Sequence, residues 1–213
     1  MVGAVVVAAG ASYRMGSPKA LLKIGEKTFL QHIVDVLQSA GITEIVVVLG
    51  SNAEVIKESL NWYDGTVVLN RDWKDGQLSS IVAGLAVLRP LALEGALICP
   101  VDHPFITRRL LTDMLHVFRL SGKGIVVPAY GTRRGHPVIF ASRMFDALRD
   151  ADLTIGARKI VKDHPDDIEE VATKEEGVVL NIDTPEDYRR TQCTELTLPK
   201  DIEHNSVDSR CHG

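Results

Sequence analysis

The sequence predicts an α/β protein, a three-layer α/β/α sandwich around a mostly parallel sheet. Short unbroken apolar runs, such as residues 4–8 and 45–49, are typical of strands buried on both faces of a parallel sheet. Between these runs, apolar residues recur at the spacing of an α-helix. Strands that alternate with helices in this way form βαβ units, and 213 residues are enough for a sizeable core.

The elements of the first two thirds of the chain follow each other in a regular order. The expected strands cover residues 4–8, 45–49, 66–69, 96–99 and 125–127. The expected helices lie between them, with apolar stripes over residues 30–37, 55–60, 81–88 and 111–118. Gly41 and Pro90 are suited to end the first and the third of these helices. The alternation predicts that most neighbouring strands run parallel.

The pattern changes after Pro128. The expected elements beyond it are an antiparallel strand, a short helix and two small strands, over residues 138–140, 155–161, 171–172 and 178–180. A last helix should begin at Thr184 and Pro185, because threonine is a good N-cap and proline suits the first turn. We expect a single domain over residues 1–192 and a flexible polar tail over residues 193–213.

The composition argues against several classes of function. The net charge of −4 and the pI of about 6.0 disfavour a general nucleic-acid binder, which would carry a basic patch or stripe. No apolar stretch is long enough to span a membrane, and the apolar start is typical of a strand and lacks the features of a signal peptide. The chain has three widely spaced cysteines, an arrangement that disfavours a disulfide framework or a structural zinc site. We therefore expect the protein in the reducing cytoplasm. Cys99 lies in an apolar run and is expected in the core.

The loop that follows the first strand carries the strongest functional signal. Gly10 and Gly16 bracket Arg14 in this loop, and Lys19 follows them. Glycines let backbone N–H groups come close to a ligand, and the two cations can make charge-assisted hydrogen bonds. Because open α/β sheets bind ligands at the carboxyl ends of their strands, we expect the loop to hold a polyphosphate. The alternative is an ordinary strand-to-helix loop with two surface cations.

This loop does not match the two common phosphate motifs. In a Walker loop the second glycine is followed directly by lysine, but here two residues separate Gly16 from Lys19. The two glycines are also one residue too far apart. The dinucleotide fingerprint G-x-G-x-x-G is absent, because no glycine stands two residues after Gly10.

Two aspartates are candidates for a magnesium site. Asp102 follows the strand expected at residues 96–99, and Asp183 stands at a strand-to-helix junction. Mg²⁺ is bound by one or two carboxylates together with substrate phosphates, so both aspartates suit it at this edge of the sheet. The alternatives are a turn residue for Asp102 and a capping role for Asp183. His103 is expected either to support the site or to face the solvent.

Two further segments are candidates for substrate contacts. Ser79 and Ser80 stand where the third helix opens, so their hydroxyls can bind a base, ribose or phosphate, or can cap the helix. Arg134 and His136 lie in a glycine-containing turn and can bind an anionic acceptor. The alternative for this second segment is a basic hairpin tip.

The chain resembles a known enzyme superfamily. Residues 6–22 are similar to L/V-x-A-A-G-x-S-x-R-M-G-x-x-K-x-L-L, the signature of nucleotidyltransferases with a glycosyltransferase-A-like fold, the nucleotide-diphospho-sugar transferase type. Ala8 and Ala9 before Gly10 resemble the cytidylyl branch, because the guanylyl branch usually has two glycines after the alanine. The resemblance is to molybdenum cofactor cytidylyltransferases and related MobA-like proteins.

Later motifs extend the resemblance over most of the chain. Asp102 matches the acidic residue of the family's G-D-x-P motif, although Val101 stands before it where glycine is usual. Asp183 matches the second aspartate of D-x-D-T-P-x-D. Residues 70–80 fit N-x-x-W-x-x-G-x-x-x-S, and residues 134–138 fit the R-G-H-P-V segment that lines the acceptor side in the cytidylyl branch.

The resemblance implies that CMP is transferred from CTP to the phosphate of the molybdopterin cofactor, with release of pyrophosphate and with Mg²⁺ as cofactor. The expected catalytic residues are Arg14, Lys19 and Asp102. The expected nucleotide contacts are Ala8, Ala9, Gly10, Arg14, Gly16, Lys19, Ser79 and Ser80. Asp102 and Asp183 are expected to hold the metal, and Arg134 and His136 the acceptor.

Two alternatives remain open at this point. The same chemistry could act on a sugar phosphate or a polyol phosphate, or the protein could be a non-catalytic chaperone that delivers molybdopterin to a molybdenum hydroxylase. Within the leading hypothesis, the methyl group of Ala9 narrows the space beside the strand end. The sequence therefore predicts a preference for CTP over GTP.

Overall fold

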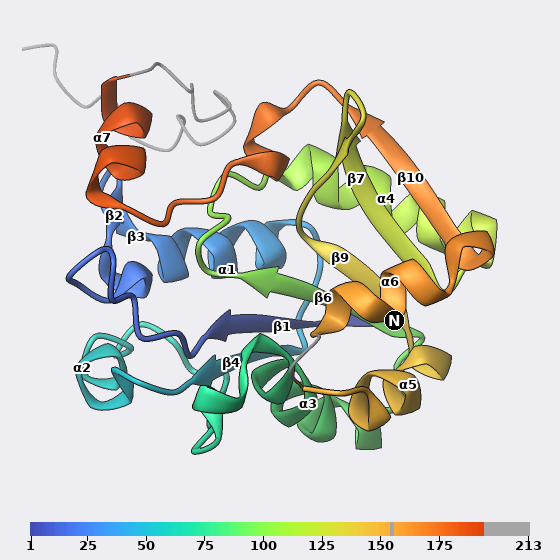
Figure 1. Ribbon diagram of the computed structural model, residues 1–213, viewed down its shortest axis with the longest axis horizontal. Helices are drawn as coiled ribbons and strands as arrows, with labels where there is room; N and C mark the ends of the chain where they lie inside the picture. Colours follow the sequence, from blue (N-terminus) through green and yellow to red (C-terminus); the bar gives the residue numbers. More distant parts are fainter. Residues whose placement is uncertain (154–155, 194–213) are drawn as a thin grey trace, which may run out of the picture.

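In the computed structural model, which describes residues 1–153 and 156–193, eight strands form one sheet (Figure 1). They are β1 (Val2–Ala8), β4 (Ile45–Leu49), β5 (Thr66–Leu69), β6 (Gly95–Pro100), β7 (Ile125–Tyr130), β8 (Arg133–Arg134), β9 (Val138–Ala141) and β10 (Ile168–Thr173). Their order is β10–β7–β9–β6–β1–β4–β5, with β8 paired to β7. The prediction of a mostly parallel sheet is confirmed, since β1 runs parallel to β4 and β6, β4 to β5, and β7 to β10.

The strand β9 is the antiparallel addition that the sequence predicts after Pro128. It lies between β6 and β7 and runs antiparallel to both, with Phe140 opposite Ala96 on one side and Ile125 on the other. The chain reverses direction between β7 and β9 through a turn at Gly131, which has a φ of 60°. That left-handed conformation favours glycine over residues with a side chain.

Helices cover the sheet in two layers (Figure 1). They are α1 (Phe29–Ser39), α2 (Ala53–Glu58), α3 (Gln77–Leu88), α4 (Arg108–Ser121), α5 (Phe145–Asp150), α6 (Ala157–Asp163) and α7 (Pro185–Cys193). One layer contains α1 and α4, which contact each other, and α4 also packs on β7 and β10. In the other layer α3 packs on β1 and β4 and contacts α5, which in turn contacts α6. The α/β fold with its central sheet is therefore as predicted.

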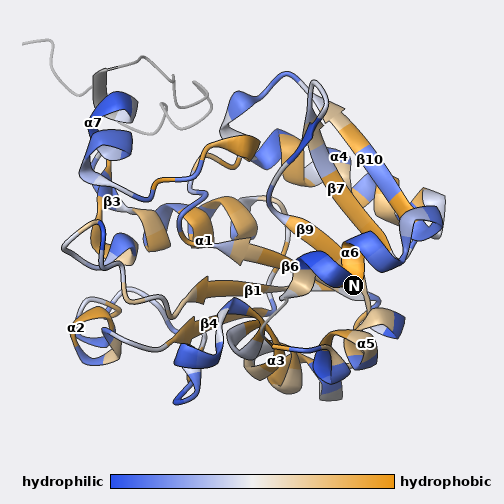
Figure 2. Ribbon diagram, in the orientation of Figure 1, coloured by the Kyte–Doolittle hydropathy of each residue, from blue (hydrophilic) through white to orange (hydrophobic). Residues whose placement is uncertain are grey.

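The core lies where the strands meet the apolar faces of these helices. Figure 2 shows hydrophobic strands in the centre and mostly hydrophilic ribbon in α6 and α7. Gly84 brings α3 unusually close to the sheet, because a Cβ atom there would lie 2.4 Å from the side chain of Val5. Cys99 is buried as expected, and burial raises the pKa of its thiol. None of the helices among the described residues is long and apolar enough to cross a membrane.

The prediction of a strand over residues 178–180 is wrong. Glu176–Val179 form a turn of 3₁₀ helix, in which Val178 is fully buried. The backbone N–H of His136 donates to the carbonyl of Val178 at 2.8 Å, so this apolar segment packs against the β8–β9 connection instead of joining the ladder. Apolar character here reports burial, which a short sequence run cannot distinguish from a strand.

Other boundaries agree to within a few residues. The helix expected over residues 155–161 is α6, although Ile155 itself lies outside the described residues. Thr184 caps α7 as predicted: its hydroxyl accepts from the N–H of Asp187 at 3.2 Å, and the Asp187 carboxylate accepts from the N–H of Thr184 at 2.9 Å. The expected tail lies, apart from Cys193, outside the described residues. The hairpin of β2 (Lys23–Ile24) and β3 (Lys27–Thr28), and helix α5, were not predicted.

Candidate nucleotide-binding site

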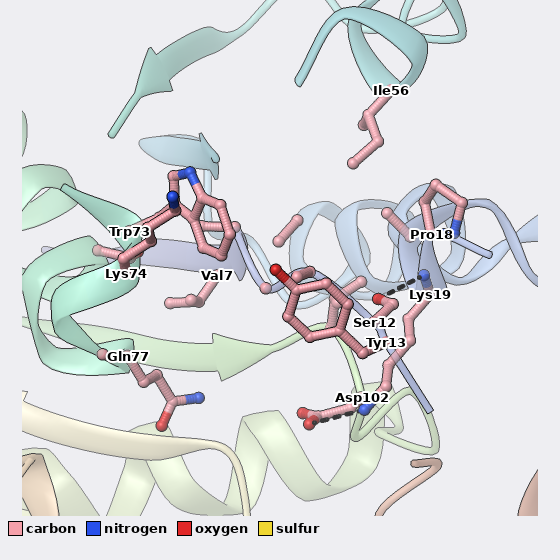
Figure 3. A pocket seen from close by; sticks show the side chains of 18 residues that line it. Val7, Ser12, Tyr13, Pro18, Lys19, Ile56, Trp73, Lys74, Gln77 and Asp102 are labelled. Atoms are coloured by element: carbon pink, nitrogen blue, oxygen red, sulfur yellow. Dashed lines mark hydrogen bonds and ion pairs between the residues drawn. The ribbon is translucent and has the colours of Figure 1, made fainter. Parts of the chain in front are cut away.

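A cavity of about 340 Å³ opens at the carboxyl ends of β1 and β6 (Figure 3). Its walls come from the loop after β1, from residues 73–80 at the start of α3, and from Val101 and Asp102 after β6. Ligand pockets for small molecules span about 300–1,000 Å³, so the cavity can hold a large part of a nucleotide. Of the predicted nucleotide and metal residues, Ala8, Ala9, Gly10, Lys19, Ser80 and Asp102 line it.

The two glycines of the loop after β1 serve different purposes. Gly16 has a φ of 75°, a conformation in which a side chain would be strained. Gly10 has no such φ, and a Cβ atom on it would meet no atom within 4 Å. Because Gly10 lines the cavity, a side chain there would occupy ligand space, whereas the fold itself would tolerate it. This agrees with the expectation that the backbone at Gly10 comes close to a ligand.

Four of the predicted charged residues meet beside this cavity. The ammonium group of Lys19 lies 3.4 Å from a carboxylate oxygen of Asp102 and forms a shorter ion pair with Asp183. The guanidinium of Arg14 lies 2.8 Å from the other carboxylate oxygen of Asp183. The side chain of Lys19 is only 11% exposed, so its charge is held inside the loop. Residues far apart in sequence therefore form one charged cluster, which we call the Arg14–Lys19–Asp102–Asp183 cluster.

Backbone hydrogen bonds explain why the two aspartates converge. The N–H of Val101 donates to the carbonyl of Val7 at 3.0 Å, which ties the end of β6 to the end of β1. The N–H of Ile182 donates to the carbonyl of Asp102 at 2.9 Å, which brings the segment before α7 to the same place. Asp183, the next residue after Ile182, is thus held close to Asp102 in the loop that follows β6. The α7 cap then fixes the direction in which the chain leaves.

The charges of the cluster shift the titration of Asp183. Burial alone raises the pKa of this carboxyl, but hydrogen bonding and charge from Lys19, and then from Arg14, outweigh burial. The pKa of Asp183 therefore lies below its ordinary value. The carboxylate is ionised at neutral pH and available to a cation.

A divalent cation fits this pair of carboxylates. Asp102 and Asp183 each direct an oxygen at one shared cation, which in this structure is the ammonium of Lys19. Two carboxylates are the protein ligands that Mg²⁺ commonly uses when substrate phosphates complete its shell. Among the described residues there is no group of three or more metal-ligating side chains. The donor set accordingly suits a metal shared with a phosphate ligand better than an all-protein metal cage.

A network around Asn70 builds the wall opposite this cluster. The buried amide of Asn70 donates to the hydroxyls of Ser79 and Ser80, both at 2.9 Å, and accepts from the N–H of Asp72 at 3.0 Å. Ser80 lines the cavity, but Ser79 does not, and the hydroxyl of Ser79 lies 2.8 Å from the carbonyl of Gly76. The serine hydroxyls thus hold together the segment that carries Trp73. The sequence motif predicted this segment but not its internal bonding.

A pair of histidines lies on the other side of Asp102. The ring centroids of His103 and His136 are 4.5 Å apart, and the Nδ1 atom of each is buried without a hydrogen-bond partner among the described residues. Burial, then the neighbouring His103 and the charge of Arg158, lowers the pKa of His136 to about 3. Burial also lowers the pKa of His103, although the charge of Asp102 opposes it. His103 is therefore half-buried, and its ring packs against His136.

The side chains of the two predicted acceptor residues, Arg134 and His136, have different partners. His136 joins His103, whereas the guanidinium of Arg134 forms an ion pair with Glu170 of β10 at 2.7 Å. Arg158 of α6, which sequence reasoning missed, acts electrostatically on both histidines. No motif marks Arg158, because only the packing of α6 brings it to this place.

A doubly covered parallel sheet with a charged cluster at its carboxyl edge defines a class, the nucleotide-binding α/β proteins. Comparison with known proteins defines the family. The chain matches the MobA-like NTP transferase domain over residues 4–168, and it belongs to this family.

Relatives with different names share this family. The nicotine blue oxidoreductase of Paenarthrobacter nicotinovorans is 29% identical over 195 residues, which is 87% of this chain and 94% of that protein. A probable molybdenum cofactor guanylyltransferase of Mycobacterium avium is 25% identical over 189 residues, which is 87% of this chain and 92% of that protein.

Solved structures agree with the fold. The protein Rv0371c of Mycobacterium tuberculosis is 30% identical, with a TM-score of 0.76 over 89% of this chain and 96% of its own. A structure of Rv0371c in complex with manganese is 27% identical in the aligned residues, with a TM-score of 0.73 and the same coverage. The 4-diphosphocytidyl-2C-methyl-D-erythritol synthase of Anaerococcus prevotii, 19% identical with a TM-score of 0.70, shares the fold over 89% of this chain and 93% of its own.

Proposed function

We propose that this protein is a Mg²⁺-dependent cytidylyltransferase that transfers CMP from CTP to the phosphate of a molybdopterin-type acceptor. The observation that carries the proposal is the Arg14–Lys19–Asp102–Asp183 cluster beside a cavity of nucleotide size. Two cations and two carboxylates are what a triphosphate and its metal require. The scarce cysteines and the absence of a membrane-spanning helix among the described residues suit a reaction in the cytoplasm.

The chemistry requires alignment and charge neutralisation more than a protein nucleophile. An oxygen of the acceptor phosphate attacks the α-phosphorus of CTP, the bond between the α- and β-phosphates breaks, and pyrophosphate leaves with the bonding electron pair. Lys19 and Arg14 stand where they can bind the triphosphate and stabilise the leaving pyrophosphate. Asp102 and Asp183 would hold the metal, which when bound neutralises phosphate charge.

The proposed acceptor side lies at His136 and Arg158. The buried Nδ1 atoms of His103 and His136 have no hydrogen-bond partner among the described residues, and Arg158 adds a positive charge that suits a phosphate. Arg134 shares the same sequence segment, but its guanidinium is already paired with Glu170. We therefore assign the acceptor contacts to His136 and Arg158 and give Arg134 a smaller role.

The proposed base is cytosine. Ala9 directly follows β1 and lines the cavity, and its Cβ lies close to Gly50, where an added Cβ would be 2.8 Å away. The methyl group reduces the space for a purine. The M. avium relative is named a guanylyltransferase, so GTP is the substrate against which CTP must be compared.

Pyrophosphate release tests the proposal. We expect release with CTP, Mg²⁺ and molybdopterin, much less with GTP or ATP, and none without an acceptor. Release with a sugar phosphate or polyol phosphate in place of molybdopterin would move the assignment to that acceptor class. Tight binding of molybdopterin without pyrophosphate release would make the protein a chaperone for a molybdenum hydroxylase. A redox change of nicotine blue without pyrophosphate release would support the activity named for the P. nicotinovorans relative.

A further inference from the structure

We propose that Trp73 and Tyr13 form an aromatic clamp that holds the base of the bound nucleotide by stacking. The proposal rests on the nucleotide as ligand, and so on the proposed function, but it concerns binding and not turnover. Both rings line the cavity, from walls that belong to different parts of the chain (Figure 3). Trp73 comes from the segment before α3, and Tyr13 comes from the loop after β1.

The fold holds Trp73 in place with little freedom. A Cβ atom on Gly50 would lie 2.7 Å from the Cβ of Trp73 and 2.6 Å from the carbonyl of Ala9, so the glycine lets β4, β1 and Trp73 meet. The hydrogen bonds of the buried Asn70 fix the same turn from its other side. An aromatic ring that is half-buried and fixed in this way forms a pre-organised wall of the cavity, beside Ala9.

Tyr13 has a different setting. Tyr13 is 83% exposed, so its ring contributes little to the core. Ser12, directly before it, has a φ of 53°, an uncommon conformation for a residue with a side chain, and the Ser12 hydroxyl accepts from the N–H of Lys19 at 3.2 Å. The loop conformation that positions Lys19 therefore also places the Tyr13 ring at the mouth of the cavity (Figure 3).

The surroundings of the two rings suit a neutral flat group. The Arg14–Lys19–Asp102–Asp183 cluster gathers the charge of the site around Asp102, whereas the wall at Trp73 is lined mostly by uncharged residues, among them Ala9, Gly76 and Gln77. Lys74 is the exception, and its ammonium lies 5.6 Å from the centre of the Trp73 ring, as in a cation–π contact. A triphosphate at the charged cluster would place its base toward this aromatic wall.

Stacking and base choice are then separate properties of the site. Every base has a π-face, so stacking tolerates all of them. Loss of Trp73 should weaken CTP and GTP by the same factor, about tenfold to a hundredfold. A change at Ala9 should instead alter the ratio of the two affinities, because it alters the width of the base site.

Calorimetric measurement of nucleotide affinity tests the proposal without any acceptor. We compare CTP, GTP and tripolyphosphate, which carries the charges but no base, on the wild type and on Trp73→Ala, Trp73→Phe and Tyr13→Ala. Trp73→Ala should bind both nucleotides about tenfold to a hundredfold more weakly, with tripolyphosphate unchanged. Trp73→Phe should stay within about threefold of the wild type, and Tyr13→Ala should lose about threefold to tenfold.

The second tryptophan of the chain provides a matched control. Trp62 does not line the cavity and packs on Tyr63 at 5.6 Å, so Trp62→Phe should bind CTP like the wild type. That variant has Trp73 as its single tryptophan, and its fluorescence should be quenched by CTP but not by tripolyphosphate.

The outcomes separate this proposal from the proposed function. Wild-type CTP affinity in Trp73→Ala, or an equal loss of CTP and tripolyphosphate, overturns the clamp. A base-dependent loss in Trp73→Ala together with no pyrophosphate release by the wild type keeps the clamp and overturns the transferase. Circular dichroism shows whether each variant is folded. If Trp73→Ala is not folded, the fluorescence of Trp62→Phe decides the proposal, because an emission that CTP leaves unchanged would overturn the clamp.

Discussion

The two sides of Asp102 differ in how their polar groups are satisfied. On the proposed donor side, the charges of Arg14, Lys19, Asp102 and Asp183 are paired with one another. On the proposed acceptor side, His103 and His136 are uncharged at neutral pH, and their buried Nδ1 atoms have no hydrogen-bond partner among the described residues. Under the proposed function, a ligand on the donor side must therefore replace internal ion pairs, whereas a ligand on the acceptor side meets uncharged histidines.

This difference suggests how one site can take two anions. A triphosphate with its metal brings both signs of charge, so it can exchange partners with a cluster that is itself balanced. An acceptor phosphate brings only negative charge and is suited to neutral donors and a nearby Arg158. Variants on each side should therefore affect different kinetic constants.

The largest effect is expected from the carboxylates. Asp102→Asn and Asp183→Asn should each lower kcat by about a hundredfold to a thousandfold, because charge stabilisation of the transition state is lost. Circular dichroism should remain that of the wild type. As a control we use Asp146→Asn, whose carboxylate forms an exposed ion pair with Arg89 away from the cavity. Full activity of Asp102→Asn at saturating Mg²⁺ would show that the metal is held elsewhere.

The next effect concerns Lys19. Its replacement by alanine should remove a charge-assisted contact worth about 1.5–3 kcal/mol and weaken CTP binding about tenfold to a hundredfold. Lys23→Ala is the matched control, because Lys23 lies in the exposed β2 strand outside the cavity. Equal CTP affinities of Lys19→Ala and the wild type by calorimetry would remove Lys19 from the phosphate site.

The acceptor side should respond through KM. Arg158→Ala should raise the KM for the acceptor about tenfold with little change in the KM for CTP, since one charge-assisted contact is lost. Arg134→Ala should raise it less than about threefold, because Glu170 holds that guanidinium. Steady-state kinetics with each substrate varied in turn provides the measurement. A larger effect from Arg134 than from Arg158 would favour the sequence prediction over the placement seen here.

Base choice should respond to Ala9. The wild type should prefer CTP over GTP by about a hundredfold, and Ala9→Gly should relax this preference by about tenfold without reversing it. Competition binding with CTP, GTP and ATP measures the ratios. If GTP binds the wild type more tightly than CTP, the cytidylyl assignment fails while nucleotidyl transfer stands.

The last prediction concerns the pH dependence of stability and not the activity. His136 stays neutral in the folded chain down to about pH 3, whereas in the unfolded chain it takes up a proton near its ordinary pKa of 6.5. Below pH 6.5 the unfolded state binds more protons, so stability falls as the pH falls, by up to about 1.4 kcal/mol per pH unit for one group. Urea unfolding from pH 7 to pH 5 should show a steeper decline for the wild type than for His136→Asn. Equal slopes would mean that His136 is not buried in its neutral form.

The sequence predicted the parts of this molecule whose structure follows from local sequence patterns. The unbroken valine run of β1 and the stripes of α1 and α4 are set by local periodicity, and Thr184 caps α7 through a local rule. The loop after β1 and the two aspartates carry motifs, and the structure brings them together.

What could not be predicted depends on contacts between distant segments. Val178 is buried because its segment packs against the β8–β9 connection. From the local sequence alone, such a buried apolar segment cannot be distinguished from a strand. Arg158 acts electrostatically on the histidines because of where the fold places α6, and Arg134 of β8 forms an ion pair with Glu170 of β10, two strands that both pair with β7. The hydrogen bonds from Asn70 to the hydroxyls of Ser79 and Ser80 likewise depend on tertiary geometry.

The fate of the phosphates tests the central claim most directly. CTP labelled in its α-phosphate and CTP labelled in its γ-phosphate are each incubated with the protein, Mg²⁺ and molybdopterin. Transfer at the Arg14–Lys19–Asp102–Asp183 cluster predicts that the α label moves into the acceptor product, while the γ label appears in an equal amount of pyrophosphate. Both labels remaining in CTP, or the α label appearing only as free CMP, would contradict the account.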